Sequence, residues 1–345
     1  MSGEGAVTVT GLREGKWAAL AALLLLAQPG YTQDRRAKDD PFVSLREHLE
    51  RTTQQGPDGS PAAPRPRAPR PQPEPRPAIW LLQDADTKIY LFGTVHILPP
   101  GYRWRSAAVN DAIRQADELV LEVGDREAMA DPATFLDPMM LGKQAPLTWR
   151  VSPERREPLR RMLEELGIPA MDTMQSWAAA LMIMAMSAMQ GIAGDEEAVD
   201  PGEMPGVEEG LETEFRALNR PISGVESVAE QIGFFRNLSF TQQRELLEAM
   251  IDDYARASAE ESDPDFLDAW IRGRPEGIVI RNEDMPGVLY EVLLPRRNRA
   301  WTDWLIARLD RPGTILFAVG AGHLAGPDSV QTMLAARGFT ATRVD

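Results

Sequence analysis

Two histidines in the sequence each close the same kind of short motif. His96 ends the run GTVH at residues 93–96, His323 ends the run GAGH at residues 320–323, and each run directly follows an apolar stretch typical of a buried strand. Ligands of open α/β sheets bind beyond the carboxyl ends of the strands, where a glycine lets the backbone turn and approach a ligand. We therefore expect adjacent strands to direct both imidazoles into one crevice, with Gly93 and Gly320 beside the bound group.

A carboxylate follows the next predicted strand. Glu122 comes directly after the apolar run at residues 119–121, so we expect it at the same edge of the sheet. Two histidines and one carboxylate are the ligands of many zinc and non-haem iron sites. The alternative is structural: a hydrogen-bonded histidine after each tight turn, and a Glu122 that caps a helix or pairs with a basic side chain. The repeated motif favours the site, because the chain has only three histidines and the third, His48, lies far from both motifs.

The composition excludes several classes of site. The 345 residues contain no cysteine, which rules out disulfides, cysteine-ligated zinc, iron–sulfur clusters, thiol catalysis and a lipid anchor on cysteine. They carry 37 Lys and Arg against 52 Asp and Glu, a net charge of −15. Proteins that bind nucleic acids usually present a basic surface, so for this acidic chain we expect no nucleic-acid partner. With 43% hydrophobic residues the chain can form a substantial core.

The first 78 residues have the composition of a targeting segment and a tether. Arg13 and Lys16 precede an apolar run at residues 17–27, which a Gln-Pro-Gly sequence closes. This pattern predicts a signal peptide or an N-terminal anchor over residues 1–30, since eleven apolar residues are too few for a membrane span of roughly 20. Residues 31–78, rich in Pro and Arg, are predicted to be a disordered linker. We expect an exported protein, periplasmic or anchored facing the periplasm, which would bring it close to a membrane.

Residues 79–345 are predicted to form one domain of mixed α/β class. Short apolar runs alternate with helical periodicity near both ends of this region, and the middle is helical. We expect a central, mixed and partly parallel sheet flanked by helices, with parallel pairing within each strand–helix–strand unit. The predicted strands cover residues 89–92, 119–121, 221–226, 314–319 and 339–344.

One uncharged segment in the middle resembles a membrane span in length. Residues 177–194 are rich in Met and Ala, and 18 residues approach the span of a bilayer. The many alanines, with Ser187, Gln190 and Gly191 among them, weaken a lipid-facing interpretation. We expect a buried central helix or the apolar wall of a groove instead.

Several of these motifs, in order, resemble the TraB/GumN family, which includes bacterial GumN-like proteins and the animal Tiki proteases. The resemblance covers residues 79–345 and none of residues 1–78. Two departures fall in the middle motif, where Val225 replaces Leu and Ser227 replaces Thr. The matching segments are YLFGTVHILP at 90–99, ADELVLEV at 116–123, GVE at 224–226 with Gln231, RNRAW at 297–301 and VGAGHLAG at 319–326.

The resemblance implies an erythromycin-esterase/Tiki-like fold and an active centre built on the two histidine motifs and a glutamate. His96 and His323 would be ligands of a divalent metal ion such as manganese, cobalt or zinc, and Glu122 a ligand or general base. In the Tiki branch this implies metal-dependent proteolysis, with a peptide or small molecule as substrate.

Three further residues receive roles from the same resemblance. Glu226 would be a second catalytic carboxylate, and Asn298 would orient a ligand. Arg297 would hold a substrate carboxylate or a developing oxyanion, or else form an ion pair at a helix start.

Three functions remain open from the sequence. The first is an exported metal-dependent hydrolase, of peptidase type by its family resemblance. The second is a metal-free esterase-type hydrolase with a histidine as general base. The third is a non-catalytic protein that captures a peptide or haem in the same crevice.

Overall fold

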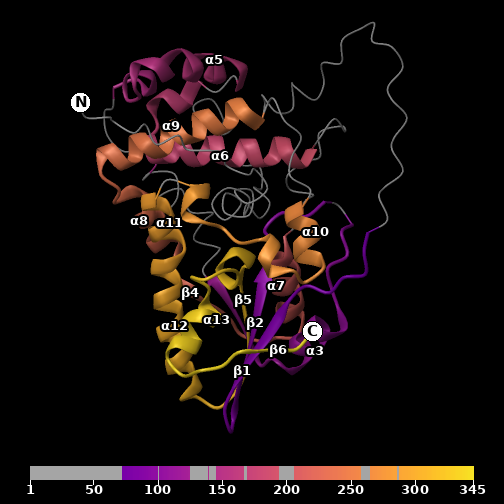
Figure 1. The fold of residues 1–345 in the computed structure, drawn as a ribbon. Coiled ribbons are helices and arrows are strands. Elements are labelled where there is room, and N and C mark those ends of the chain that lie inside the picture. The colour runs from indigo at the N-terminus through magenta and orange to yellow at the C-terminus, as the bar shows by residue number, and fades with distance from the viewer. Residues whose placement is uncertain are drawn as a thin grey trace, which may run out of the picture.

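The computed structural model describes residues 72–99, 101–124, 139, 145–166, 169–193, 206–257, 265–285 and 287–345 (Figure 1). The predicted signal or anchor at 1–30, His48 and the linker up to residue 71 lie outside the described residues. The last residues of the expected linker already contact the domain: Arg76 donates its backbone N–H to Ile271 C=O at 2.7 Å.

A six-stranded sheet forms the centre, in the order β4-β3-β5-β2-β1-β6. The pairs β2–β5, β3–β5 and β3–β4 are parallel, whereas β1 is antiparallel to both β2 and β6. The predicted mixed, partly parallel sheet is therefore confirmed. The strands are β1 (Ile79–Gln83), β2 (Thr87–Thr94), β3 (Glu118–Val123), β4 (Ile222–Glu226), β5 (Gly313–Gly320) and β6 (Thr342–Arg343).

The strand pairing at the two chain ends differs from the prediction. β1 lies outside the predicted strands. It forms a hairpin with β2, whose turn is held by the Asp84 side chain, which accepts the backbone N–H groups of Asp86 and Thr87. The expected pairing within each strand–helix–strand unit is wrong: β5 lies between β2 and β3 and is parallel to both, and the last strand does not pair with β5. Gly338, at a φ of 86°, turns the chain away from β5, and the short β6 pairs with β1 at the opposite edge.

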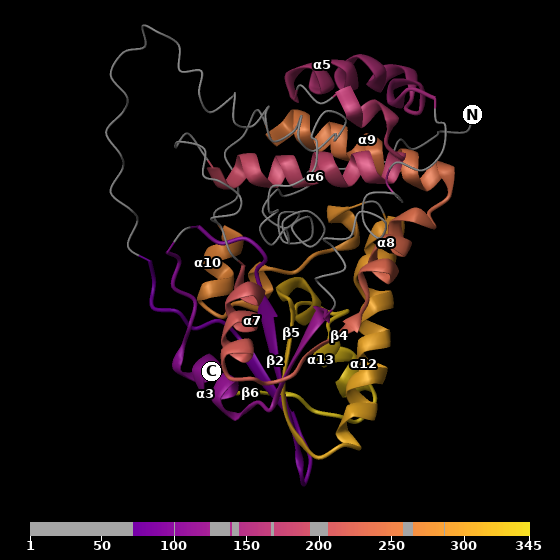
Figure 2. The same ribbon diagram turned by 180° about the vertical axis from the view of Figure 1, so that it is seen from behind.

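Helices cover both faces of the sheet (Figures 1 and 2). On one face, α3, α7 and α10 bury their apolar side chains against β2, β3 and β5. On the other face, α12 and α13 pack against β1, β2 and β5. The bounds are α3 (Ala107–Gln115), α7 (Val207–Ala217), α10 (Asp265–Ile271), α12 (Pro295–Leu309) and α13 (Val330–Ala336).

A third apolar cluster lies in the helical middle of the chain, and the parallel strands point toward it (Figure 1). Helices α6 and α9 pack side by side here, and residues 177–184 of α6 are all buried. Over the described residues, no helix combines the length and apolarity that crossing a membrane requires. The bounds are α5 (Arg156–Leu166), α6 (Ser176–Ala193), α8 (Val228–Arg236), α9 (Phe240–Ala257) and α11 (Gly287–Leu293).

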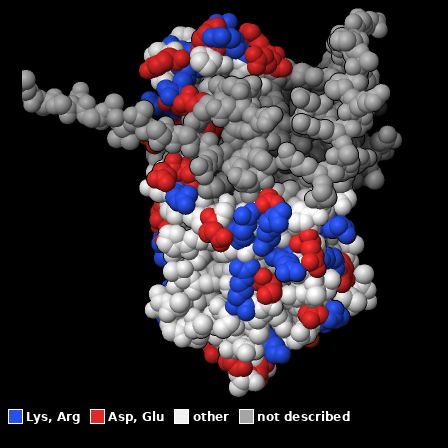
Figure 3. Space-filling model, turned by 45° about the vertical axis from the view of Figure 1, so that its right-hand side comes forward, with Lys and Arg blue, Asp and Glu red and all other residues white. Residues whose placement is uncertain are grey.

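Acidic and basic side chains intermingle on the surface. On the face in Figure 3, Lys and Arg side chains gather beside Asp and Glu side chains. Near the C-terminal end of α10, for example, Arg272 and Arg274 both pair with Asp268, at 2.7 and 2.5 Å.

Candidate active site

The two histidine motifs leave neighbouring strands at the same level of the sheet. β2 and β5 pair in parallel, with Gly93 opposite Val319 and Thr94 opposite Gly320. His96 follows the end of β2, and His323 lies in the 3₁₀ turn η8 (Ala321–Leu324) directly after β5. The two histidines therefore follow neighbouring parallel strands, and of the two motifs only the second forms a 3₁₀ turn.

The side chains of both histidines and Glu122 surround one position, which is where a side chain on residue 320 would begin if it were not glycine. A Cβ atom built on Gly320 would lie 3.1 Å from Glu122 Oε1, 3.5 Å from His96 Nε2 and 3.6 Å from His323 Cδ2. Glu122 reaches this point from β3, the neighbour of β5 on its other side. Its Oε1 also accepts the backbone N–H of Gly320 at 2.7 Å. The predicted meeting of the three groups is thus present.

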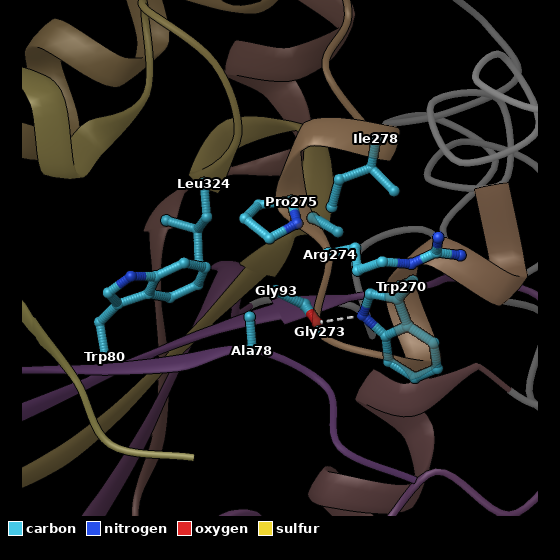
Figure 4. A pocket seen from close by; sticks show the side chains of 10 residues that line it. Ala78, Trp80, Gly93, Trp270, Gly273, Arg274, Pro275, Ile278 and Leu324 are labelled. Carbon is cyan, nitrogen blue, oxygen red and sulfur yellow. Dashed lines mark hydrogen bonds between the residues drawn. The ribbon is translucent and has the colours of Figure 1, made fainter. Parts of the chain in front are cut away.

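Gly93 serves the packing of the two turns. A Cβ atom there would approach Cα of Ala321 to 3.0 Å, so glycine allows the motifs to lie in contact. The carbonyl of Gly93 accepts the indole N–H of Trp270 at 2.8 Å (Figure 4). The cavity in that figure, about 10 Å³, holds at most about one water molecule and lies beside Gly93 and Ala321.

His323 is fixed in one tautomer by Asn298. Oδ1 of Asn298 lies 2.6 Å from Nδ1 of His323, while Nδ2 of Asn298 donates to the carbonyl of Asp328 at 2.7 Å. Because Oδ1 can only accept, Nδ1 carries the proton and Nε2 presents a lone pair. That lone pair faces Nη1 of Arg297 at 3.2 Å. Burial, and then the charge of Arg297, lower the pKa of His323 to about 3, so the ring stays neutral.

His96 is held by a residue that the sequence did not reveal. Nδ1 of His96 lies 2.6 Å from Oε1 of Glu208, and the Thr94 hydroxyl donates to the same oxygen at 2.5 Å. Burial raises the pKa of Glu208, but the contacts with His96 and Thr94 outweigh it and lower this pKa overall. The signal in the sequence is faint: Glu208 and Glu212 lie beside the buried apolar stripe of α7.

Arg297 on α12 joins the two predicted carboxylates. Its Nη2 donates to Glu122 Oε2 and to Glu226 Oε2, each at 2.7 Å, and all three side chains are less than 10% exposed. Burial alone would raise the pKa of Glu122, but Arg297 and the nearby histidines bring it down to about 2. The two carboxylates likewise raise the pKa of Arg297. Arg297 is therefore a permanent buried cation beside the site.

Glu226 lies at the end of β4 and is engaged entirely with donors of the protein. It accepts hydrogen bonds from the side chains of Arg297, Gln231 at 3.0 Å and Trp301 at 2.9 Å. Its carboxylate therefore holds Arg297 in place, whereas the carboxylate of Glu122 faces the histidines.

The donor atoms fit a divalent cation in kind. Both histidines hold Nδ1 toward a hydrogen-bond acceptor and turn the other side of the ring toward the site, which is the arrangement of metal-bound histidines. The distances between these donor atoms do not fit an ion: within the described ranges no group of three or more His, Asp or Glu side chains is arranged to hold a metal. The guanidinium of Arg297 lies against two of the donors, His323 and Glu122.

The sequence pattern of the TraB/PrgY/gumN family matches residues 78–343, which include every residue of this site. The chain belongs to the TraB/PrgY/gumN family. Its resemblance to TraB/GumN proteins is thus confirmed. The chain is also 25% identical over 264 residues to the uncharacterized protein YbaP of Escherichia coli K12, covering 75% of this chain and 92% of YbaP. YbaP of Shigella flexneri gives the same identity and coverage. No solved structure matches this TraB-family chain.

Proposed function

We propose that this TraB-family protein is an exported metal-dependent hydrolase, and that its substrates are peptides. One observation carries the proposal: two imidazoles, each held at Nδ1 by a buried acceptor, meet the carboxylate of Glu122 around Gly320. His96, His323 and Glu122 would hold the ion, which when bound would activate a water molecule and polarise a carbonyl group.

The charge balance of the cluster supports a cation. Glu122 and Glu226 share the single guanidinium of Arg297, and the third buried carboxylate, Glu208, contacts His96 instead. Since buried charges need compensation, the cluster has room for further positive charge. Glu122 is the carboxylate that faces Gly320, and it is therefore the better acceptor for a proton of an attacking water than Glu226, whose oxygens are engaged with Arg297, Gln231 and Trp301.

The peptide substrate is supported by a groove beside the site. This groove, about 380 Å³ in volume, is lined by Gly124, residues 222–227 of β4 and its continuation, and Glu230. In the described sheet β4 pairs with β3 only, so its other side is an edge. An extended peptide can add to such an edge through main-chain hydrogen bonds. The groove contains Glu226, so a peptide bound along β4 would run up to the Arg297 cluster.

A metal-free hydrolase is the second candidate, and two observations favour it. Nη1 of Arg297 lies 3.2 Å from Nε2 of His323, where a ligated ion would have to bind. His96 and Glu208 form a buried carboxylate–imidazole pair, which is the arrangement of a histidine general base. In this alternative His96 takes the proton of the attacking water and Arg297 counters the charge that develops on the substrate oxygen.

Metal content and peptide cleavage separate the two candidates. The purified chain is analysed for bound metal, then assayed on a peptide library before and after chelator treatment, with Mn²⁺, Co²⁺ or Zn²⁺ added back. The proposal expects about one ion per chain, cleavage that chelators abolish, and loss of both in His96→Ala and His323→Ala. Cleavage that survives chelation would replace it with the metal-free hydrolase, and no cleavage under any condition would contradict both.

The export part of the proposal rests on residues 1–30, with Arg13 and Lys16 before the apolar run. Fractionation of a Gram-negative host that produces the full chain tests it, with the mass of the product as a second readout. We expect the chain in the periplasm or at the periplasmic membrane face. A full-length chain in the cytoplasm would contradict export.

A further inference from the structure

We propose that Glu208 and Thr94 are positioning residues that fix the tautomer and orientation of His96. Only one consequence of this proposal rests on the proposed function, namely that Nε2 of His96 is turned toward the reacting groups. Its structural content concerns three side chains that meet away from Gly320, and it can be tested on the chain without metal or substrate.

The contacts are short and buried. Nδ1 of His96 lies 2.6 Å from Oε1 of Glu208, and the two side chains are 9% and 12% exposed. The Thr94 hydroxyl donates to the same carboxylate oxygen at 2.5 Å, and Thr94 is fully buried. Hydrogen bonds to an ionised carboxylate in such surroundings are about twice as strong as neutral ones. Glu208 therefore binds the Nδ1–H tautomer, and Thr94 restrains the carboxylate.

The start of α7 is attached to the loop that carries His96. The backbone N–H of Val207 donates to the carbonyl of Val95 at 3.0 Å. A Cβ atom on Gly206 would come within 2.2 Å of the carbonyl oxygen of His96, so only glycine lets the two backbones touch here. Glu208 is the second residue of α7, where a negative charge is also favoured by the helix dipole. These backbone contacts thus place the side chain of Glu208 beside the ring of His96.

The orientation of the His96 ring is informative, because a purely structural ion pair with Glu208 could form through either ring nitrogen. The nitrogen used is Nδ1, and the opposite nitrogen, Nε2, points to the space at Gly320 beside Glu122. His323 shows the same division, with Asn298 at its Nδ1. Two unrelated elements, α7 and α12, therefore impose one tautomer on both histidines.

Nitrogen-15 NMR of the histidine rings tests the proposal directly. The full chain has three histidines, so His96→Gln assigns the His96 signals by their loss. In the wild type without metal, we expect a proton on Nδ1 and none on Nε2 of His96. In Glu208→Gln we expect a mixture of tautomers, because an amide can either donate to Nδ1 or accept from it. Thr94→Val, which keeps Glu208, should broaden or shift the same signals.

Glu212→Gln is the matched control, since Glu212 is a buried glutamate one turn along α7 that pairs with Arg216 at 2.8 Å. It should leave the His96 signals unchanged, and Glu208→Asp should restore part of the Nδ1–H population. Binding of Zn²⁺ or Mn²⁺, measured by titration, should weaken about 10- to 100-fold in Glu208→Gln and remain near wild type in Glu212→Gln.

Two results would overturn the proposal: a wild-type His96 protonated on Nε2, or identical His96 signals in the wild type, Glu208→Gln and Thr94→Val. Either one is independent of catalysis. If instead the tautomers behave as expected and the wild type binds no metal and cleaves no peptide, the positioning role stands and the proposed function fails.

Discussion

Nη2 of Arg297 lies 2.7 Å from Oε2 of Glu122, in a position where both residues are at most 4% exposed. Water screens neither charge, so Glu122 depends on Arg297 for compensation, and Arg297 depends on Glu122 and Glu226. The same guanidinium contacts Nε2 of His323, which makes Arg297 the link between the carboxylates and the histidine motifs. Its removal should therefore affect stability as well as chemistry.

We predict that Arg297→Met lowers the free energy of unfolding by about 3 to 5 kcal/mol, because it leaves two buried carboxylates without their cation. Urea denaturation at neutral pH measures the change. Arg299→Met is the control: Arg299 lies on the same helix, half exposed, with Glu291 as its partner. Exposed pairs contribute at most about 1 kcal/mol. Equal losses in the two variants would contradict the prediction.

The free energy of unfolding should depend on pH through the titration of His323. Its pKa falls from 6.5 to about 3 on folding, through burial first and Arg297 second. Between these values only the unfolded chain binds this proton, so the free energy of unfolding falls as the pH decreases below about 6.5, by up to about 1.4 kcal/mol per pH unit. Glu122, with a pKa lowered from 4.5 to about 2, adds a second loss only below about 4.5.

Urea denaturation of the wild type and His323→Gln over the range from about pH 5 to pH 7 checks this prediction. The variant cannot take up the proton, so its stability should fall less steeply with decreasing pH. Glu122→Gln should keep the wild-type slope in this range. Parallel curves for the wild type and His323→Gln would show that His323 does not titrate as its surroundings require.

How far the sequence predicts this site depends on the residue. The meeting of His96 and His323 is predictable because each directly follows an apolar run, and parallel neighbours bring such ends together. The position of Arg297 is not. Arg296, Arg297 and Arg299 follow one another on α12, and only the packing of that helix decides which of them turns inward.

Glu208 and β1 escaped prediction for related reasons. A glutamate in the first turn of a helix normally faces solvent and interacts favourably with the helix dipole, so the local sequence marks Glu208 as buried only faintly. Its burial follows from the contact between Gly206 and the backbone of His96, which joins segments more than 100 residues apart. β1 is short and is defined by its partner β2, which local patterns do not reveal.

The glycine at the meeting point should be essential for the site and dispensable for the fold. In Gly320→Ala the added methyl group would lie 3.1 Å from Glu122 Oε1 and 3.5 Å from His96 Nε2, where the neighbours need to move by only a few tenths of an ångström. We predict near-wild-type stability, with metal binding and peptide cleavage reduced at least tenfold. Gly233→Ala on α8, whose methyl group meets nothing closer than 3.6 Å, is the control and should keep metal binding and peptide cleavage at the wild-type level. Unchanged metal binding and cleavage in Gly320→Ala would contradict the proposed centre.

A different glycine should contribute to the stability of the fold itself. Gly124, just beyond β3, and Gly224 in β4 lie so close that a Cβ atom on Gly224 would come within 2.1 Å of the Gly124 nitrogen. The obstacle is backbone, so Gly224→Ala must displace β4 and with it Glu226, the anchor of Arg297. We predict a loss of about 1 to 3 kcal/mol in urea denaturation, accompanied by weaker peptide cleavage. Gly233→Ala, whose methyl group meets nothing closer than 3.6 Å, is again the control and should keep both stability and cleavage. If Gly224→Ala proved as stable and active as Gly233→Ala, the close crossing of Gly124 and Gly224 would not govern the position of Glu226.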